Sequence, residues 1–305
     1  MRTLVVINTL SGEGDAGLYD YVRALGATGT EVTLRFCDGT KRLEDFAADA
    51  ATFERVGAAG GDGTVSAVCY ALRDSGVPVL VYPAGTANLV ALNVGMPQEP
   101  RALAEITMTG TQVRFDIGEI VAGPPAEDGD AGAGFMVMAG AGYDASVIQA
   151  AAALKSTLGA AAYLLAAVGN LTPTTAEFAL ELDGRHVDTD GIAVLVINFG
   201  RLQFDIEVAR GADPRDGVFD IAVLRSHNAA GLVPAVIAGM FDRGGGRNAV
   251  PGIDLYLASR VRVESEPTLN MQYDGEAVEA STPFEARVLP GAATLLLPPD
   301  SPFAR

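Results

Sequence analysis

Four apolar runs of strand length, rich in β-branched residues, alternate with helical patterns over the first third of the chain. Strands separated by single helices predict right-handed crossovers and a largely parallel, Rossmann-like sheet. In such sheets ligands bind beyond the carboxyl ends of the strands, in the loops that lead into helices. The expected strands are residues 3–8, 31–37, 54–60 and 77–83, and the expected helices are residues 16–25, 43–51 and 64–74.

After about residue 113 the pattern changes to short segments that alternate in polarity or pair across Asp-Gly turns, which is typical of antiparallel sheet. We therefore predict an α/β domain over residues 1–117 and a β-rich domain over residues 118–287. A last strand, within about residues 288–305, is expected to return to the first domain. Two helical patches rich in small and apolar residues, 144–171 and 228–241, interrupt the second domain.

The formal net charge of −17 over 305 residues argues against nucleic acid as a partner, because a polyanion would be repelled on average. The same charge disfavours adsorption to anionic lipid through a basic patch. Cys37 and Cys69 are the only cysteines and form no CxxC pair, which fits a reducing compartment. The apolar start reads as a strand, and residues 157–171 are too short for a confident membrane span, so we expect a cytoplasmic protein.

The stretch AAGGDGTVSAVCYAL (58–72) places bare glycines at the end of a strand and enters a helix near Thr64. Glycines let backbone N–H groups approach a phosphate, and the helix N-terminus adds partial positive charge. Asp62 would oppose phosphate unless a cation intervenes, so the combination suggests metal-assisted phosphoryl transfer. The alternative is that Gly60–Gly63 is only a tight turn, since short glycine motifs are weak evidence alone.

A second loop of the same design follows the next strand, in YPAGTANLVALNVGMP (82–97). Together, GGDGT and PAGTANLVA resemble the diacylglycerol kinase catalytic-domain family, the bacterial lipid kinases related to sphingosine and ceramide kinases. Further matches in order are INTLSG (7–12), FDIGEI (115–120), GADPRDGVFDIAVL (211–224) and MQYDGEAV (271–278).

The resemblance implies a phosphofructokinase- or NAD kinase-like α/β domain that holds ATP, followed by a β-sandwich domain that admits a lipid hydroxyl. The implied activity is ATP- and Mg²⁺-dependent phosphorylation of a lipid alcohol, with diacylglycerol as the first candidate, by a protein transiently at the membrane surface. A homodimer is also expected, because dimers are common. The helical patches would then pack in the core or flank an acyl-chain cleft.

The nucleotide-binding residues that the resemblance implies lie on the loops after successive strands. Asn8, Ser11 and Gly12 also read as a plain Ser-Gly turn, and Thr40 also reads as a helix N-cap. The complete implied set is Asn8, Ser11, Gly12, Thr40, Gly60, Gly61, Asp62, Gly63, Thr64, Gly85, Thr86 and Asn88.

Asp62, Asp274 and Glu276 are the implied catalytic residues, with Asp274 or Glu276 as base for the lipid hydroxyl. From the residues alone, YDGEAV is an Asp-Gly hairpin, like ELDGRH (181–186). The resemblance also implies a structural Mg²⁺ held by Asp213, Asp216 and the Val218 carbonyl, with Asp116 as partner carboxylate. A solvated acidic loop is the alternative for the 213–218 segment.

The chain departs from the family pattern at several points. Ser66 and Ala67 stand where an Asn-Glu pair is usual, Thr9 replaces a proline, and only Gly200 remains of a Gly-Gly stretch. Two rival functions follow: an NAD kinase, whose later motifs are missing from the sequence, and a catalytically weak nucleotide- or lipid-binding module, which Ala67 motivates.

Overall fold

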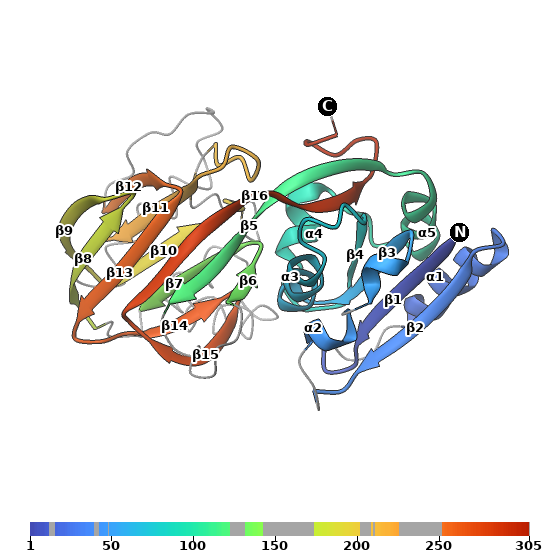
Figure 1. Ribbon diagram of the computed structural model, residues 1–305, viewed down its shortest axis with the longest axis horizontal. Helices are drawn as coiled ribbons and strands as arrows, with labels where there is room; N and C mark the ends of the chain where they lie inside the picture. The colour runs from blue at the N-terminus through green and yellow to red at the C-terminus, as the bar shows by residue number, and fades with distance from the viewer. Residues whose placement is uncertain are drawn as a thin grey trace, which may run out of the picture. The chain divides into compact units, whose positions relative to one another are not determined.

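The computed structural model describes residues 1–11, 16–39, 43–47, 49–122, 132–142, 174–201, 209, 211–225 and 252–304. The chain divides into two compact units. The first unit holds residues 1–117, 134–136 and 289–305, and the second holds residues 118–133 and 137–288. Figure 1 shows the helices and strands of both units, coloured along the chain.

The first unit is built on a parallel sheet with the strand order β2-β1-β3-β4-β16. All seven residues of β1 pair with β2 without a shift in register, and β1 also pairs with β3 on its other side. The prediction of a largely parallel α/β sheet is confirmed. The strands are β1 (Arg2–Asn8), β2 (Glu31–Cys37), β3 (Arg55–Gly60), β4 (Val79–Pro83) and the end of β16 (Phe284–Leu297), with α1 (Ala16–Ala27), α2 (Leu43–Phe46), α3 (Asp62–Ala71), α4 (Leu89–Val94) and α5 (Pro100–Thr109).

Buried apolar side chains of the central strands form the core of this unit, because both neighbouring strands and helices cover them. Tyr21 of α1 is fully buried, its ring lies 5.2 Å from that of Tyr82 in β4, and its hydroxyl lies 3.0 Å from Thr107 Oγ1 in α5. Burial raises the pKa of the Tyr21 phenol far above its ordinary value. The side chain therefore ties α1 and α5 to the sheet in its neutral form.

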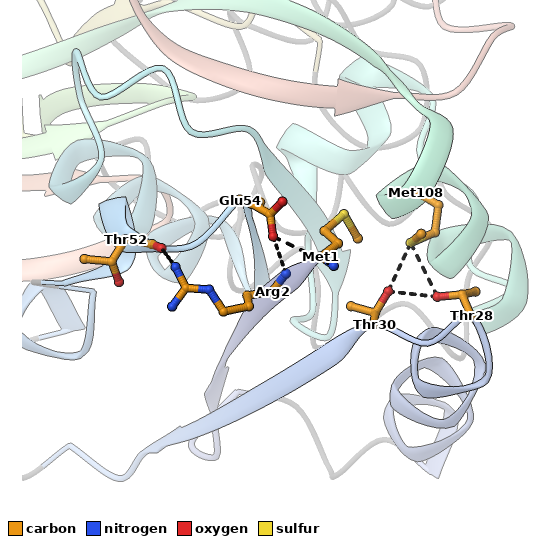
Figure 2. A network of polar contacts seen from close by, with 7 residues as sticks. All are labelled: Met1, Arg2, Thr28, Thr30, Thr52, Glu54 and Met108. Carbon is orange, nitrogen blue, oxygen red and sulfur yellow. Dashed lines mark hydrogen bonds and ion pairs between the residues drawn. The ribbon is translucent and has the colours of Figure 1, made fainter.

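Polar contacts hold the amino ends of β1 and β2 (Figure 2). The Arg2 backbone N–H donates to Glu54 Oε2, and its guanidinium donates to the Thr52 carbonyl. Before β2, the Thr30 hydroxyl lies 2.8 Å from that of Thr28 and donates to Met108 Sδ at 3.5 Å. The start of the outermost strand is thereby joined to α5.

The helix expected over residues 43–51 is wrong in extent, since α2 ends at Phe46 and Ala50–Thr52 forms a 3₁₀ turn. The Asp49 carboxylate accepts two hydrogen bonds from the Arg35 guanidinium of β2. This side-chain pairing outside the helix fits the weak helix propensity of Asp and Thr.

The second unit is an antiparallel β-sandwich, as predicted. One of its sheets has the order β12-β11-β10-β7-β14-β15, and β8, β9, β13 and the start of β16 belong to the other. The expected Asp-Gly hairpins are present as β8–β9 and β14–β15. The strands are β7 (Met138–Gly142), β8 (Ala176–Leu182), β9 (Arg185–Gly191), β10 (Ala193–Ile197), β11 (Phe219–Leu224), β12 (Ile253–Ala258), β13 (Arg260–Glu266), β14 (Asn270–Tyr273) and β15 (Glu276–Ser281).

The described residues also include the strands β5 (Thr111–Ala122) and β6 (Ala133–Phe135). The helical patches expected over residues 144–171 and 228–241 lie outside the described residues. Within the described part of the chain, no helix is long and apolar enough to cross a bilayer.

Candidate active site

In the first unit, the two glycine loops touch each other directly. A Cβ placed on Gly85, after β4, would lie 2.4 Å from the Gly61 Cα, after β3. A Cβ on Gly60 would lie 2.3 Å from Thr64 Oγ1. Because neither position has room for a side chain, the bare backbone is a packing requirement as well as a means of approaching a ligand.

Asp62 links the two loops through its buried carboxylate. Its side chain is only 6% exposed, and its two oxygens accept the N–H groups of Leu89 at 2.9 Å and Val90 at 2.8 Å. These amides open α4 and need an acceptor from outside that helix. Asp62 is therefore a positioning residue for the second loop; its predicted catalytic role remains a prediction.

The end of β1 joins the same cluster. Asn8 Nδ2 donates to Thr64 Oγ1 at 3.0 Å, and Ser11 Oγ accepts the Gly61 N–H at 3.4 Å. The structure thus brings Asn8, Ser11, Gly61 and Thr64 together from loops that are far apart in sequence. Gly12 and Thr40 lie outside the described residues.

Asn88 closes the second loop on itself. Its Oδ1 accepts the Gly85 N–H at 2.9 Å, its Nδ2 donates to the Gly85 carbonyl at 2.7 Å, and its backbone is left-handed with φ of 50°. Asn tolerates this conformation better than most residues. The neighbouring Thr86 is exposed, as a ligand-contacting hydroxyl would have to be, while Gly63 is partly exposed at the start of α3.

In the second unit, Asp274 lies at the turn between β14 and β15 and is 6% exposed. Its Oδ1 accepts the N–H groups of Val137 at 2.8 Å and Met138 at 3.1 Å, and its own N–H donates to the Met138 carbonyl. The hairpin interpretation of this segment is therefore correct, and it is compatible with a catalytic role. Glu276 begins β15, and its side chain lies outside the described residues.

The segment predicted to hold a structural metal forms a tight turn in the second unit. Asp213 binds the Arg215 guanidinium through both oxygens, at 2.8 and 3.0 Å, and Asp216 Oδ1 accepts the Val218 N–H at 3.1 Å. Asp116, in the first unit, is 1% exposed and accepts the Gly291 N–H at 2.6 Å. No group of three or more metal-ligating side chains occurs among the described residues.

Three hydrogen bonds at the entry to β7, made with two side chains, were missed by reasoning from sequence. Ser66 Oγ in α3 accepts the Met136 N–H at 3.0 Å and is 1% exposed, and the next two N–H groups bind Asp274. In the sequence, Ser66 stands out only as a departure from the family pattern. Backbone donors can belong to any residue, so the sequence carried no signal for these pairings.

An α/β unit with paired glycine loops, joined to an antiparallel β-sandwich, defines a two-domain architecture that known proteins share. Residues 2–120 match the family described as "Diacylglycerol kinase catalytic domain", and residues 137–297 match the "YegS C-terminal NAD kinase beta sandwich-like domain".

Curated relatives match over most of their length. The protein named "Probable lipid kinase YegS-like" of Klebsiella pneumoniae (strain 342) is 28% identical over 95% of this chain and 90% of that protein. A protein of the same name from Pseudomonas fluorescens is 30% identical over 83% of this chain and 81% of its own. A crystal structure of a diacylglycerol kinase from Bacillus anthracis str. Sterne shares the fold, with a TM-score of 0.70, 19% identity and coverage of 98% and 97%.

The chain therefore belongs to the YegS-like lipid kinases of the diacylglycerol kinase catalytic-domain family. The resemblance inferred from its motifs is confirmed.

Proposed function

We propose that the protein transfers the γ-phosphoryl group of ATP to the hydroxyl of a membrane lipid, with diacylglycerol as the first acceptor to test. The observation that carries this proposal is the direct contact between the loops at Gly61 and Gly85. The two turns carry no side chains at their contact, and α3 starts at Asp62. Backbone N–H groups at such a helix start and in such turns are suited to donate hydrogen bonds to a chain of phosphates.

Residues of the first unit would bind and orient the nucleotide. The glycine loop would present N–H groups, and Thr86 would offer its exposed hydroxyl. The buried Thr64 would support the loop through its contact with Asn8, and Asp62 would hold the second loop in place through Leu89 and Val90. Magnesium, when bound, would neutralise the charge that develops on the phosphoryl oxygens. For the structural Mg²⁺ expected at Asp213, Asp216 and the Val218 carbonyl, with Asp116 as partner, the oxygen donors suit a hard cation. Asp213 forms an ion pair with Arg215, so the ion would have to compete with this guanidinium for the carboxylate.

Asp274 or Glu276 would accept the proton of the lipid hydroxyl. Asp274 Oδ1 already accepts two backbone amides, so removing its carboxylate would disturb the structure as well as any proton transfer. Glu276→Gln is therefore the sharper first test, because loss of turnover with unchanged unfolding would give Glu276 a direct role in the reaction, as the base or as a metal ligand. Wild-type turnover in that variant would leave Asp274 as the base.

The decisive assay offers a panel of lipid alcohols in mixed micelles with γ-labelled ATP and magnesium. We expect labelled lipid from at least one acceptor and none from the Asp62→Ala variant. Measurable ATP binding without labelled product from any acceptor would instead support the weak binding module that Ala67 motivates. Full turnover by Asp62→Ala would remove the assigned role of the glycine loop.

We further propose that the protein is cytoplasmic and meets its substrate transiently at the membrane surface through apolar contact. The net charge of −17 disfavours both nucleic acid and anionic lipid as electrostatic partners. Liposome binding should therefore persist when moderate salt is added, because salt screens charge and leaves apolar contact intact. Binding that disappears in moderate salt would contradict this mode of attachment.

A further inference from the structure

Strand β2 ends the sheet of the first unit and pairs only with β1 among the described strands (Figure 1). An edge strand exposes a row of backbone N–H and C=O groups that can pair with another chain. Proteins usually protect such edges with charged side chains, lysine above all, with proline, with a bulge or with a very short strand. Glu31–Cys37 contains no proline or lysine, and its register with β1 is regular over seven residues. Its two charged residues, Glu31 and Arg35, are of opposite sign, so they do not make the edge repel a second copy of itself.

The strand is also held firmly at both ends. At its start, Thr30 is joined to Met108 of α5, as Figure 2 shows. At its end, the Cys37 carbonyl accepts both the backbone N–H of Thr9 at 3.0 Å and its hydroxyl at 2.9 Å. An edge fixed in this way is preorganised, so pairing with another strand costs little additional ordering.

One face of β2 carries apolar side chains that remain exposed. Val32, Leu34 and Phe36 alternate onto the same face, where Leu34 is 38% and Phe36 57% exposed. Leu10, which is 70% exposed, lies just beyond the carboxyl end of the strand, where its Cδ1 would lie 2.8 Å from a Cβ on Gly39. A bilayer could cover the apolar side chains, but it offers no partners for the row of backbone groups. A protein strand satisfies both.

The sequence of β2 is complementary to itself in the antiparallel direction. If a twofold axis passes beside Thr33, Glu31 lies opposite Arg35 of a second copy and Val32 lies opposite its Leu34. Opposite charges and apolar pairs directly across antiparallel strands are stabilising. Arg35 keeps its contact with Asp49, so the charges select the register more than they add affinity.

We propose that β2 pairs antiparallel with β2 of a second copy around Thr33, which joins the two sheets into one across a symmetric dimer. The interface is isologous, since the same strand contributes both halves. This proposal is independent of the lipid kinase reaction, because a dimer can form whether or not lipid is phosphorylated.

Cysteine crosslinking tests both the interface and its register. Directly opposed residues in antiparallel strands have Cα atoms about 4.5 to 5.5 Å apart, within the range of a disulfide. Thr33→Cys, oxidised with glutathione disulfide, should therefore give a covalent dimer on a non-reducing gel. Val32→Cys and Leu34→Cys should crosslink when the two variants are mixed, and much less when either is alone. Native Cys37 should not interfere, since burial, with a contribution from Asp38, raises its pKa to about 11.

Asp188→Cys is the matched control, because it lies on the exposed edge strand β9 and reports random collision. Sedimentation of the uncrosslinked protein should show a dimer, and Leu34→Lys should shift it to a monomer without changing the circular dichroism spectrum. A monomeric wild type, or a Thr33→Cys yield no greater than that of Asp188→Cys, would overturn the proposal.

Discussion

The two Asp-Gly hairpins of the second unit have the same turn geometry but differ in burial. Asp183 and Gly184 have φ of 50° and 83°, and Asp274 and Gly275 have φ of 48° and 80°, as a type I′ turn requires. In each, the Asp carboxylate accepts the N–H of the first residue of a third strand, Arg260 or Met138.

The backbone N–H of each Asp also donates to the carbonyl of that same residue. The hairpins differ mainly in burial, since Asp183 is exposed and Asp274 is 6% exposed. A turn carboxylate that accepts a backbone hydrogen bond from a neighbouring strand thus occurs at both hairpins of this protein. The burial of Asp274, and not its hydrogen bond to the neighbouring strand, distinguishes the candidate catalytic turn from the other one.

The largest effect is expected for Asp274→Ala. It removes the acceptor for two buried amides, each worth about 1–3 kcal/mol when left unsatisfied, so the free energy of unfolding should fall by roughly 3 kcal/mol or more. Asp183→Ala should cost about 1 kcal/mol, because water replaces the lost acceptor at an exposed site. Urea unfolding of both variants measures the difference, and equal losses would contradict the role given to burial.

Ser66→Ala should have the next largest effect. It removes the acceptor of the buried Met136 N–H, which precedes the two N–H groups that Asp274 binds. The expected cost is about 1–3 kcal/mol. Ala67→Ser is the control, since it adds a hydroxyl at the next residue, which is partly exposed. It should change the free energy of unfolding by less than about 0.5 kcal/mol. A Ser66→Ala variant as stable as the wild type would mean that Met136 finds another acceptor.

Much of this architecture could be predicted from sequence, because period and turn chemistry are local. The apolar runs gave the strands of the parallel sheet, and the Asp-Gly pairs at Asp183 and Asp274 gave both hairpins. The extent of α2 was misjudged, since the Asp49 side chain binds Arg35 on a distant strand. Such a contact has no local signature.

The candidate site was predictable only in part, for the same reason. Glycines in loops indicate that the backbone approaches another group closely, and Gly61 and Gly85 do contact each other. The partners of the buried acids were not predictable, because Asp62 and Asp274 bind backbone N–H groups whose identity no side chain reveals. The family resemblance therefore suggested catalysis for both acids, and reasoning from sequence missed the positioning contacts that the structure adds.

The glycines of the two hairpins form a matched pair that isolates turn geometry from burial. Gly184 and Gly275 both have left-handed backbones, and nothing lies within 4 Å of a Cβ added to either. Alanine should therefore cost about 1–2 kcal/mol at each site, through backbone strain alone. Unfolding measurements should give equal losses for Gly184→Ala and Gly275→Ala. A much larger loss at Gly275 would show that the second turn is constrained by more than its own conformation.

The smallest effect is expected for Asp183→Asn, and it should depend on pH. Partial burial opposes ionisation, but hydrogen bonds from Ser259 and the Arg260 N–H outweigh it and lower the pKa of Asp183. A depressed pKa stabilises the fold above the unfolded value of about 3.9, and this contribution is lost as the pH falls through the folded value. The difference between Asp183→Asn and the wild type should thus be below about 1 kcal/mol at neutral pH and should vanish in acid. A difference that grows as the pH falls would reverse the sign and show that the carboxylate destabilises this turn.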